Sequence, residues 1–350
     1  MRLRALAATL VLAALACPAA AQPDPLRERF TARLEATGGD DVPRAAYRRM
    51  WEVMDSLVLR ELRRGGDAGE VNRALAELPG YAAPSEGDAV TIGRGSFYSE
   101  LPRALPGYVV VPVRAGREPL LMGVYNFGVN APGRVSLFAR RAGAWRRTGV
   151  VDARFPVVPY LLPLADSGLA VVTLETFTGG DHQDGTARVW RVRRGVLEPL
   201  RTLTGEMKEP SAETTNGRVR IAFTRFPTRL AAPILGTRIA YVTTLSAAGA
   251  GVSVATEVAN PWVEVVDRYY ALAARNPAGA RALLADPALA RRLGTRAPDA
   301  DDDGGDLRAG NGWLVAEPGG VRYRITSRRS ADGRWRITAV EPEPERPSAQ

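Results

Sequence analysis

The feature that most constrains the fold is the period of the hydrophobic pattern. From about Ala89 to Val258, apolar and β-branched residues alternate with polar ones at a period of two. The segments YVVVPV, PLLMGVYNF, RVSLFAR, LAVVTLETF, ARVWRVRR, RVRIAFTRF and TRIAYVTTL are typical of strands, and turn signals such as Asp184-Gly185 separate them. Because no helical pattern interrupts the series, residues 86–259 are predicted to form antiparallel sheets.

Helical periodicity precedes this region. Asp24 can cap a helix that begins at Pro25, and an amphipathic stripe runs from Tyr47 to Leu62. Residues 22–85 are therefore predicted to form a helical segment. Its apolar stripe is expected to pack against the next domain.

Helical periodicity also follows the strands. An amphipathic helix is predicted after Asn260, then one or two short helices that end at Gly294, then three short strands. Residues 260–341 are therefore predicted to form a small α+β domain. The charged, proline-rich residues 342–350 are expected to be disordered. The fold class as a whole is mainly β with helical flanks.

The β region contains a weak internal repeat. GRVSLFARRAGAW from Gly133 and ARVWRVRRGVL from Ala187 are similar, and GRVRIAFTRF from Gly217 is a poorer third copy. A period near 50 residues fits a module of about four strands. Since two or three modules cannot close a propeller, a sandwich or an incomplete, blade-like stack is expected.

The N-terminus predicts export. MRLR is a basic segment, ALAATLVLAALA is an apolar one, and small residues follow, so residues 1–21 read as a signal peptide cleaved after Ala21. The alternative is a lipoprotein anchored through Cys17. The protein is therefore expected in the periplasm or outside the cell, or lipid-anchored to the envelope.

The composition excludes several chemistries. Cys17 is the only cysteine and His182 the only histidine, so a mature disulfide, a thiol nucleophile and the usual zinc and iron sites are not expected. The net charge is +9, but the basic residues are scattered, so no nucleic-acid partner is expected. The partner is expected to be an unidentified component of the envelope or the exterior.

His182 lies in the turn TGGDHQDG, between Asp181 and Asp184. One interpretation is a polar turn in which Gly179 and Gly180 allow unusual backbone angles. The alternative is a catalytic site, in which His182 pairs with an aspartate, or Glu175 and Asp181 act as acid and base in a hydrolase or lyase.

The segment from Asp166 to Val192 resembles the strand-turn-strand unit of secreted bacterial VCBS and FG-GAP-type β-repeat proteins. The [ST]-G-G-x-H turn carries the resemblance, although the following residues, Gln183 and Asp184, depart from it. The resemblance implies a module for adhesion or recognition, without catalysis.

The best metal candidate is an acidic loop. Asp299, Asp301 and Asp303, followed by glycine, match the opening of a calcium loop, and Asp306 is a further possible ligand. Because Gly310 stands where a bidentate glutamate is needed, the alternative is a solvated linker.

The segment from Trp262 to Val340 resembles the nuclear-transport-factor-like domains. The resemblance rests on its aromatic helix and on a final strand with the pattern G-x-W-x-I, which begins at Gly333. The resemblance implies a small-ligand pocket near Tyr269, Tyr270 and Trp313, which the alternative interpretation assigns to the core. A further candidate is a glycan-binding strand face that carries Tyr125 and Phe127. The function predicted from these features is an exported, non-catalytic binding or structural protein.

Overall fold

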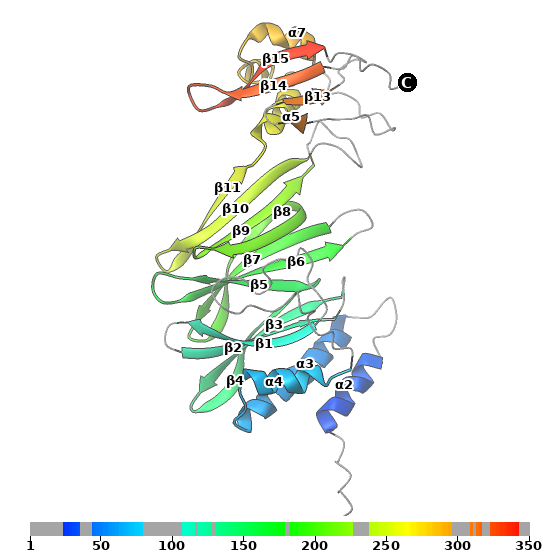
Figure 1. The fold of residues 1–350 in the computed structure, drawn as a ribbon, viewed down its shortest axis with the longest axis vertical. Coiled ribbons are helices and arrows are strands. Elements are labelled where there is room, and N and C mark those ends of the chain that lie inside the picture. The colour runs from blue at the N-terminus through cyan, green and yellow to red at the C-terminus, as the bar shows by residue number, and fades with distance from the viewer. Residues whose placement is uncertain are drawn as a thin grey trace, which may run out of the picture.

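The computed structural model of the protein is elongated, and its parts follow one another along the long axis (Figure 1). It describes residues 24–35, 44–79, 107–115, 118–127, 131–178, 183–226, 238–295, 309–310, 313–316 and 323–342. The architecture is mainly antiparallel β with helical parts, which confirms the predicted class.

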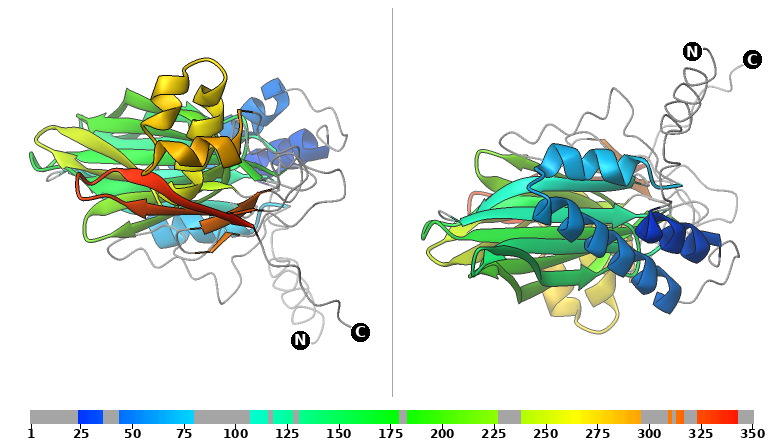
Figure 2. Two further views of the ribbon diagram at one scale, coloured as in Figure 1. Left: turned by 90° about the horizontal axis from the view of Figure 1, so that it is seen from above. Right: turned by 90° about the horizontal axis from the view of Figure 1, so that it is seen from below.

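Three helices form the first part: α2 (Pro25–Glu35), α3 (Arg44–Arg63) and α4 (Ala68–Ala76). The predicted apolar stripe of α3 is buried, including Trp51 and Leu57. Helix α4 begins with a capping box, in which Asp67 and Glu70 each accept the other's backbone N–H. The helices lie across one face of the first sheet (Figure 2, right).

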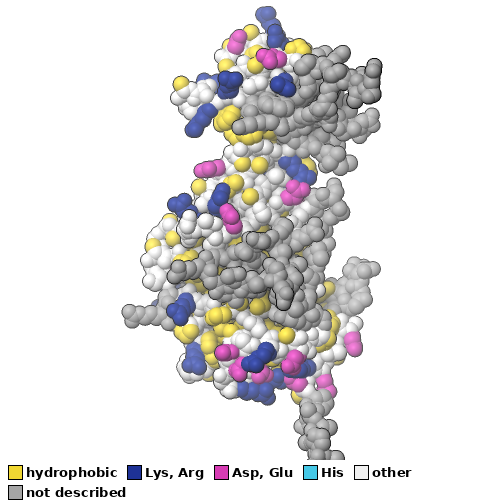
Figure 3. Space-filling view, viewed as in Figure 1, with side chains coloured by type: hydrophobic (Ala, Val, Ile, Leu, Met, Phe, Trp, Pro, Cys, Tyr) yellow, Lys and Arg dark blue, Asp and Glu magenta, His cyan; other side chains and the backbone are white. Residues whose placement is uncertain are grey.

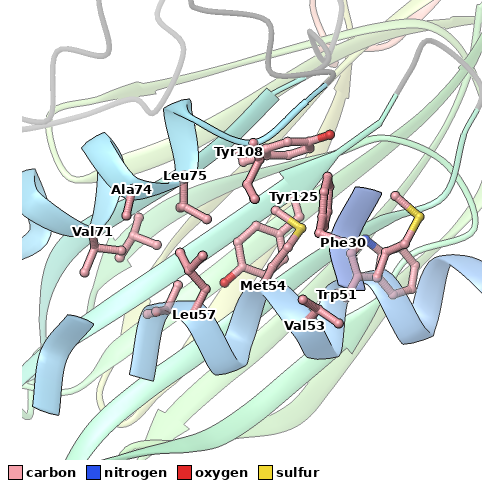
Figure 4. Close-up of a cluster of buried hydrophobic side chains, with 14 of the residues drawn as sticks. Phe30, Trp51, Val53, Met54, Leu57, Val71, Ala74, Leu75, Tyr108 and Tyr125 are labelled. Atoms are coloured by element: carbon pink, nitrogen blue, oxygen red, sulfur yellow. The ribbon is translucent and has the colours of Figure 1, made fainter. Parts of the chain in front are cut away.

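The first sheet has the order β1-β2-β3-β4. Its strands are β1 (Gly107–Ala115), β2 (Glu118–Asn126), β3 (Gly133–Arg141) and β4 (Ala144–Asp152). Strand β3 is buried on both faces, since seven consecutive residues, from Gly133 to Ala139, are buried. On one face Phe30, Trp51 and Leu75 from the helices meet Tyr108 and Tyr125 from the sheet (Figure 4).

The second sheet has seven strands in the order β11-β10-β9-β8-β7-β6-β5. They are β5 (Val157–Pro163), β6 (Leu169–Thr178), β7 (Gln183–Arg193), β8 (Val196–Thr215), β9 (Arg218–Arg225), β10 (Ile239–Ala248) and β11 (Gly251–Val258). The long strand β8 changes neighbour along its length: residues 196–208 pair with β7, and residues 208–215 pair with β9. The sheet therefore consists of two four-stranded meanders that share β8.

Hydrophobic cores lie between successive layers. An inter-sheet core joins the first sheet to one face of β5, β6 and β7, and includes Leu137 and Val171. A central core joins the other face of these strands to β9 and β10, and includes Tyr160 and Ile221. Strand β9 alternates between buried and exposed residues, so the last meander is buried on one face only.

Seven of the strands between residues 107 and 258 match the sequence prediction, but β4, β5, β8 and β11 were missed. Strand β4 is largely exposed, so it lacks the apolar alternation that marks a half-buried strand. Strands β5 and β8 contain prolines, such as Pro159 and Pro199, which disfavour a central strand. Both prolines are tolerated because β5, and the half of β8 that holds Pro199, pair with a described strand on one side only.

The last part combines α5 (Pro261–Ala273), α6 (Pro277–Arg281), a 3₁₀ helix η2 (Pro287–Leu289) and α7 (Ala290–Leu293) with a four-stranded sheet. Its strands are β12 (Ala309–Gly310), β13 (Trp313–Ala316), β14 (Tyr323–Arg329) and β15 (Trp335–Pro342), one more than predicted. Helix α7 ends at Gly294, as predicted, where φ is 68°. Among the described helices, none has the length and apolar character that crossing a membrane requires.

Candidate functional site

Several predicted site residues lie outside the described residues. These are the turn residues Asp181 and His182, the acidic loop with Asp299, Asp301, Asp303 and Asp306, and Cys17. The catalytic, calcium-binding and lipidation hypotheses that depend on them therefore stay predictions.

Glu175 is described, and it is buried near the end of β6. Its Oε2 accepts the backbone N–H of Arg154 at 2.9 Å, and its Oε1 lies 3.4 Å from the guanidinium of Arg188. The carboxylate thus ties β6 to β7 and to the loop before β5. This arrangement gives Glu175 a structural role in holding three segments together.

Asp184, at the start of β7, lies beside Lys208 of the neighbouring strand β8. Asp184 forms an ion pair with Lys208 at 2.6 Å, and the ammonium of Lys208 lies 5.6 Å from the ring centre of Phe226. The guanidinium of Arg238 also lies near Phe226, 5.2 Å from its ring centre, and forms an ion pair with Glu209 at 2.5 Å. Two ion pairs, Asp184–Lys208 and Glu209–Arg238, therefore lie beside the ring of Phe226.

Tyr269 and Tyr270 fill the core of the C-terminal domain. Both side chains are buried, and their hydroxyl groups donate to the carbonyl oxygens of Gly294 at 2.9 Å and Leu293 at 3.2 Å. Burial raises the pKa of both phenols. These contacts support the interpretation of the two tyrosines as core residues. The side chain of Trp313 lies outside the described residues.

The predicted glycan-binding face at Tyr125 and Phe127 is wrong. Tyr125 is fully buried under the helices, and the Phe127 ring packs against Trp51 and Tyr108. Strand alternation correctly placed the two aromatics on one face, but that face belongs to the core.

A charged cluster that the sequence analysis did not identify lies between α3 and the first sheet. We call it the Asp55 cluster, and its members are Asp55, Tyr125, Arg134, Arg147 and Asp152. Asp55 is only 2% exposed, and Tyr125 donates to its Oδ1 at 3.0 Å. Its Oδ2 accepts from Arg147 at 2.6 Å and from Arg134 at 3.3 Å.

Arg134 connects the cluster to a second carboxylate. Its Nε donates to Asp152 at 2.7 Å, and its guanidinium lies 4.8 Å from the ring centre of Trp51. Arg44 and Arg48 of α3 bind Asp152 as well, through its carbonyl and its carboxylate. The cluster therefore cross-links the helix to β3 and β4 through charge-assisted hydrogen bonds.

The electrostatic surroundings affect two members of the cluster. Burial, reinforced by the negative charge of Asp55, raises the pKa of Tyr125 well above its usual value, so its hydroxyl stays a donor. Burial is the largest single effect on Arg147 and lowers its pKa, but the hydrogen bond to Asp55 and the negative charges of Asp55 and Glu52 together raise the pKa above its usual value.

A groove of about 560 Å³ opens beside this cluster, and we call it the α3–β4 groove. Helix α3 contributes Glu52, Asp55, Ser56, Leu59 and Arg63, and β4 contributes residues 144–147. Trp145 is half-buried there, and the side chain of Arg147 is 35% exposed. The groove therefore combines an aromatic ring with donors and acceptors, a set that suits a polar ligand with some apolar surface.

A second groove, of about 810 Å³, lies between α2, α3 and α4. Its charges are largely paired: Arg60 binds Asp24 at 2.5 Å, and Arg27 pairs with Glu77. Figure 3 shows acidic and basic side chains intermingled at this helical end. We interpret these pairs as ties between the three helices.

Within the described residues, no three His, Cys, Asp or Glu side chains are grouped so that they could hold a metal ion. No protein-family model matches the chain, and no curated protein or solved structure matches it either.

Proposed function

We propose that the protein is an exported, non-catalytic binding protein of the bacterial envelope, built as a stack of β-modules with a ligand groove at its helical end. Export rests on the signal-peptide pattern of residues 1–21. The observation that carries the binding function is the α3–β4 groove, in which Trp145 lies beside an arginine held in place by a buried carboxylate.

The spacing of the strands supports the stack. Strand β1 begins at residue 107, β5 at 157, and the part of β8 that pairs with β9 at 208. The starts are thus 50 and 51 residues apart (157 − 107 and 208 − 157), close to the period expected from the sequence. Each module buries a face against the next, and the helices cover the outer face of the first, as stacked repeats require.

The chemistry of the groove favours a polyhydroxylated ligand. The Trp145 ring packs partly against the helical core and carries the Arg140 guanidinium 5.6 Å from its centre, and its half-buried surface is the aromatic part of the groove. Glu52, Ser56, Arg63 and Arg147 offer carboxylate, hydroxyl and guanidinium groups. Sugar rings present both C–H faces and hydroxyl groups, so a glycan segment of the envelope matches this mixture. Since Asp55 fixes Arg147 before binding, little ordering of that side chain is required.

The experiment is a calorimetric titration of the mature protein with soluble fragments of peptidoglycan and of lipopolysaccharide. Trp145→Ala removes the aromatic surface and is expected to weaken binding about tenfold, which corresponds to about 1.4 kcal/mol. Arg73→Ala, on the exposed side of α4, is the matched surface control and is expected to leave binding unchanged.

Circular dichroism of both variants would show that the fold is retained. Equal affinity of Trp145→Ala and the parent protein for a bound glycan would place its site elsewhere. The absence of binding to either class of glycan would refute the proposed ligand.

A further inference from the structure

The free edges of the sheets differ in how they are protected. In β1, the side-chain amide of Asn72 binds both the N–H of Val110 at 2.7 Å and its carbonyl at 2.8 Å. Pro112 lies two residues further on, so its nitrogen faces the same edge and offers no donor. This edge of the first sheet is therefore closed to further strand pairing.

Strand β5 is protected in the same way. Asn126 binds the N–H of Val157 at 2.9 Å and its carbonyl at 3.0 Å, and Pro159 follows two residues later. The edge half of β8 holds Pro199 beside a register shift. The edge strand β4 has a register shift and carries Arg146 and Arg147. Proline, charge and irregularity are the usual means of preventing edge pairing.

Strand β11 has fewer of these devices, and its only charged residue is Glu257. Its sequence, GVSVATEV, contains no proline, lysine or arginine, and it pairs with β10 without a register shift. Ala259 donates to the carbonyl of Ala240, and antiparallel pairs alternate in hydrogen bonding. The backbone groups of Val252, Val254, Thr256 and Val258 therefore point away from β10, to the side where no other described strand pairs with β11.

The side chains at this edge are incompletely covered. Val252 and Val254 are half-buried and pack against the margin of the central core. A further strand along β11 would cover them and continue that core. In Figure 1 the strand forms the upper edge of the seven-stranded sheet, on the side of the C-terminal domain.

We infer that β11 is a self-association edge, at which two copies of this chain pair antiparallel about a twofold axis beside Ala255. In this register Val252 faces Val258 of the second copy, and Val254 faces its Thr256, so apolar and β-branched residues meet on the core side. Glu257 faces Ser253 of the second copy, so the glutamates of the two copies do not lie opposite each other.

An isologous pair of this kind satisfies the outward backbone groups of all four edge residues in both copies. A different peptide would need a sequence that matches the side chains of β11 in one register. Two copies of β11 already match each other because the pairing is symmetric. The two seven-stranded sheets would then form one continuous sheet.

The test uses register-specific disulfide formation in a Cys17→Ser background. Ala255→Cys places two cysteines directly opposite each other at a non-hydrogen-bonded pair, where Cα atoms are about 4.5 Å apart, within disulfide reach. Ser253→Cys is the matched control, because it is equally exposed but its two copies are offset by four residues, about 13 Å. Mild oxidation is expected to cross-link Ala255→Cys and to leave Ser253→Cys largely uncross-linked.

A second measurement does not depend on cysteine chemistry. Light scattering coupled to size exclusion is expected to show a dimer that dissociates in Val254→Pro. This proline removes an outward N–H and leaves the bonds to β10 intact, which circular dichroism would verify. A monomeric parent protein at the highest soluble concentration, equal cross-linking of both cysteine variants, or an unaltered dimer in Val254→Pro would overturn the inference.

Discussion

Asp55→Asn is expected to destabilise the protein strongly, because the substitution removes a charge on which a buried network depends. The side chain of Asp55 is 3% exposed, and Arg134, which it binds, is equally buried. Asparagine keeps the shape and one oxygen acceptor, but it leaves Asp152 as the only carboxylate among the described residues that pairs with the guanidinium of Arg134. Arg147 is less affected, since its side chain is 35% exposed and can turn to water.

The expected magnitude follows from these contacts. A hydrogen bond to a charged group contributes about 1.5–3 kcal/mol, and removing one partner of a buried ion pair costs about 3–5 kcal/mol. Because Asp152 and the Trp51 ring still hold Arg134, we expect about 3 kcal/mol for Asp55→Asn. Asp55→Ala also leaves the Tyr125 hydroxyl without its acceptor and should cost about 4–5 kcal/mol.

Equilibrium unfolding in urea, followed by circular dichroism and tryptophan fluorescence, measures these losses. Glu213→Gln is the control, because Glu213 pairs with Arg220 on the surface, where both side chains are half exposed. A pair of this kind contributes at most about 1 kcal/mol. The difference between the two variants should persist in high salt, because buried charges are screened less than exposed ones. Equal shifts of the unfolding midpoint for Asp55→Asn and Glu213→Gln would refute the reasoning.

Three further predictions concern other contacts. Asn126→Ala should lower the free energy of unfolding by about 2–5 kcal/mol, because it leaves the backbone N–H and carbonyl of Val157 without a hydrogen bond. The control Asn276→Ala, which removes an exposed helix cap, should lower it by about 1 kcal/mol. Urea unfolding measures both losses, and equal losses would contradict the argument. The hydrogen bond from Arg60 lowers the pKa of Asp24, so the stability that this pair contributes is present above the ordinary carboxyl pKa and is lost as pH falls through the lowered value. Melting temperatures measured through the acid range should therefore converge for the parent protein and Asp24→Asn, and a constant difference would argue against it. Millimolar calcium, compared with EDTA and zinc, should raise the melting temperature if the acidic loop at 299–306 is a calcium site, and an unchanged melting temperature would leave it a linker.

The sequence predicted those elements whose burial is one-sided or whose ends are marked. The apolar stripe of α3 and the stop of α7 at Gly294 fall where expected. Strands β3 and β6 are buried on both faces, and they were found because their sequences are rich in apolar and β-branched residues. Strands β4 and β11 were missed because they lie at exposed edges, where burial imposes no alternation.

The Asp55 cluster could not be predicted from local pattern. Asp55 comes from a helix, and the two arginines that bind it, Arg134 and Arg147, come from strands about 80 and 90 residues later. The one available signal is an aspartate within the apolar stripe of α3, at a position that a simple amphipathic helix would fill with an apolar residue. Such a residue indicates a buried partner, but it does not identify which of the many arginines provides it.

The joints between parts of the molecule show why buried polar groups recur here. Apolar cores resist separation, but they resist sliding only weakly, because hydrophobic contact has no direction. At three joints an asparagine side chain binds backbone groups of the neighbouring part: Asn72 joins α4 to β1, Asn126 joins the first sheet to β5, and Asn260 joins α5 to β10 through Arg238 and Ala240. Each of these amides has both a donor and an acceptor engaged, which only one alignment of the two parts allows. We therefore infer that the cores provide most of the affinity between the layers, and that these asparagines, together with the Asp55 cluster, determine their alignment.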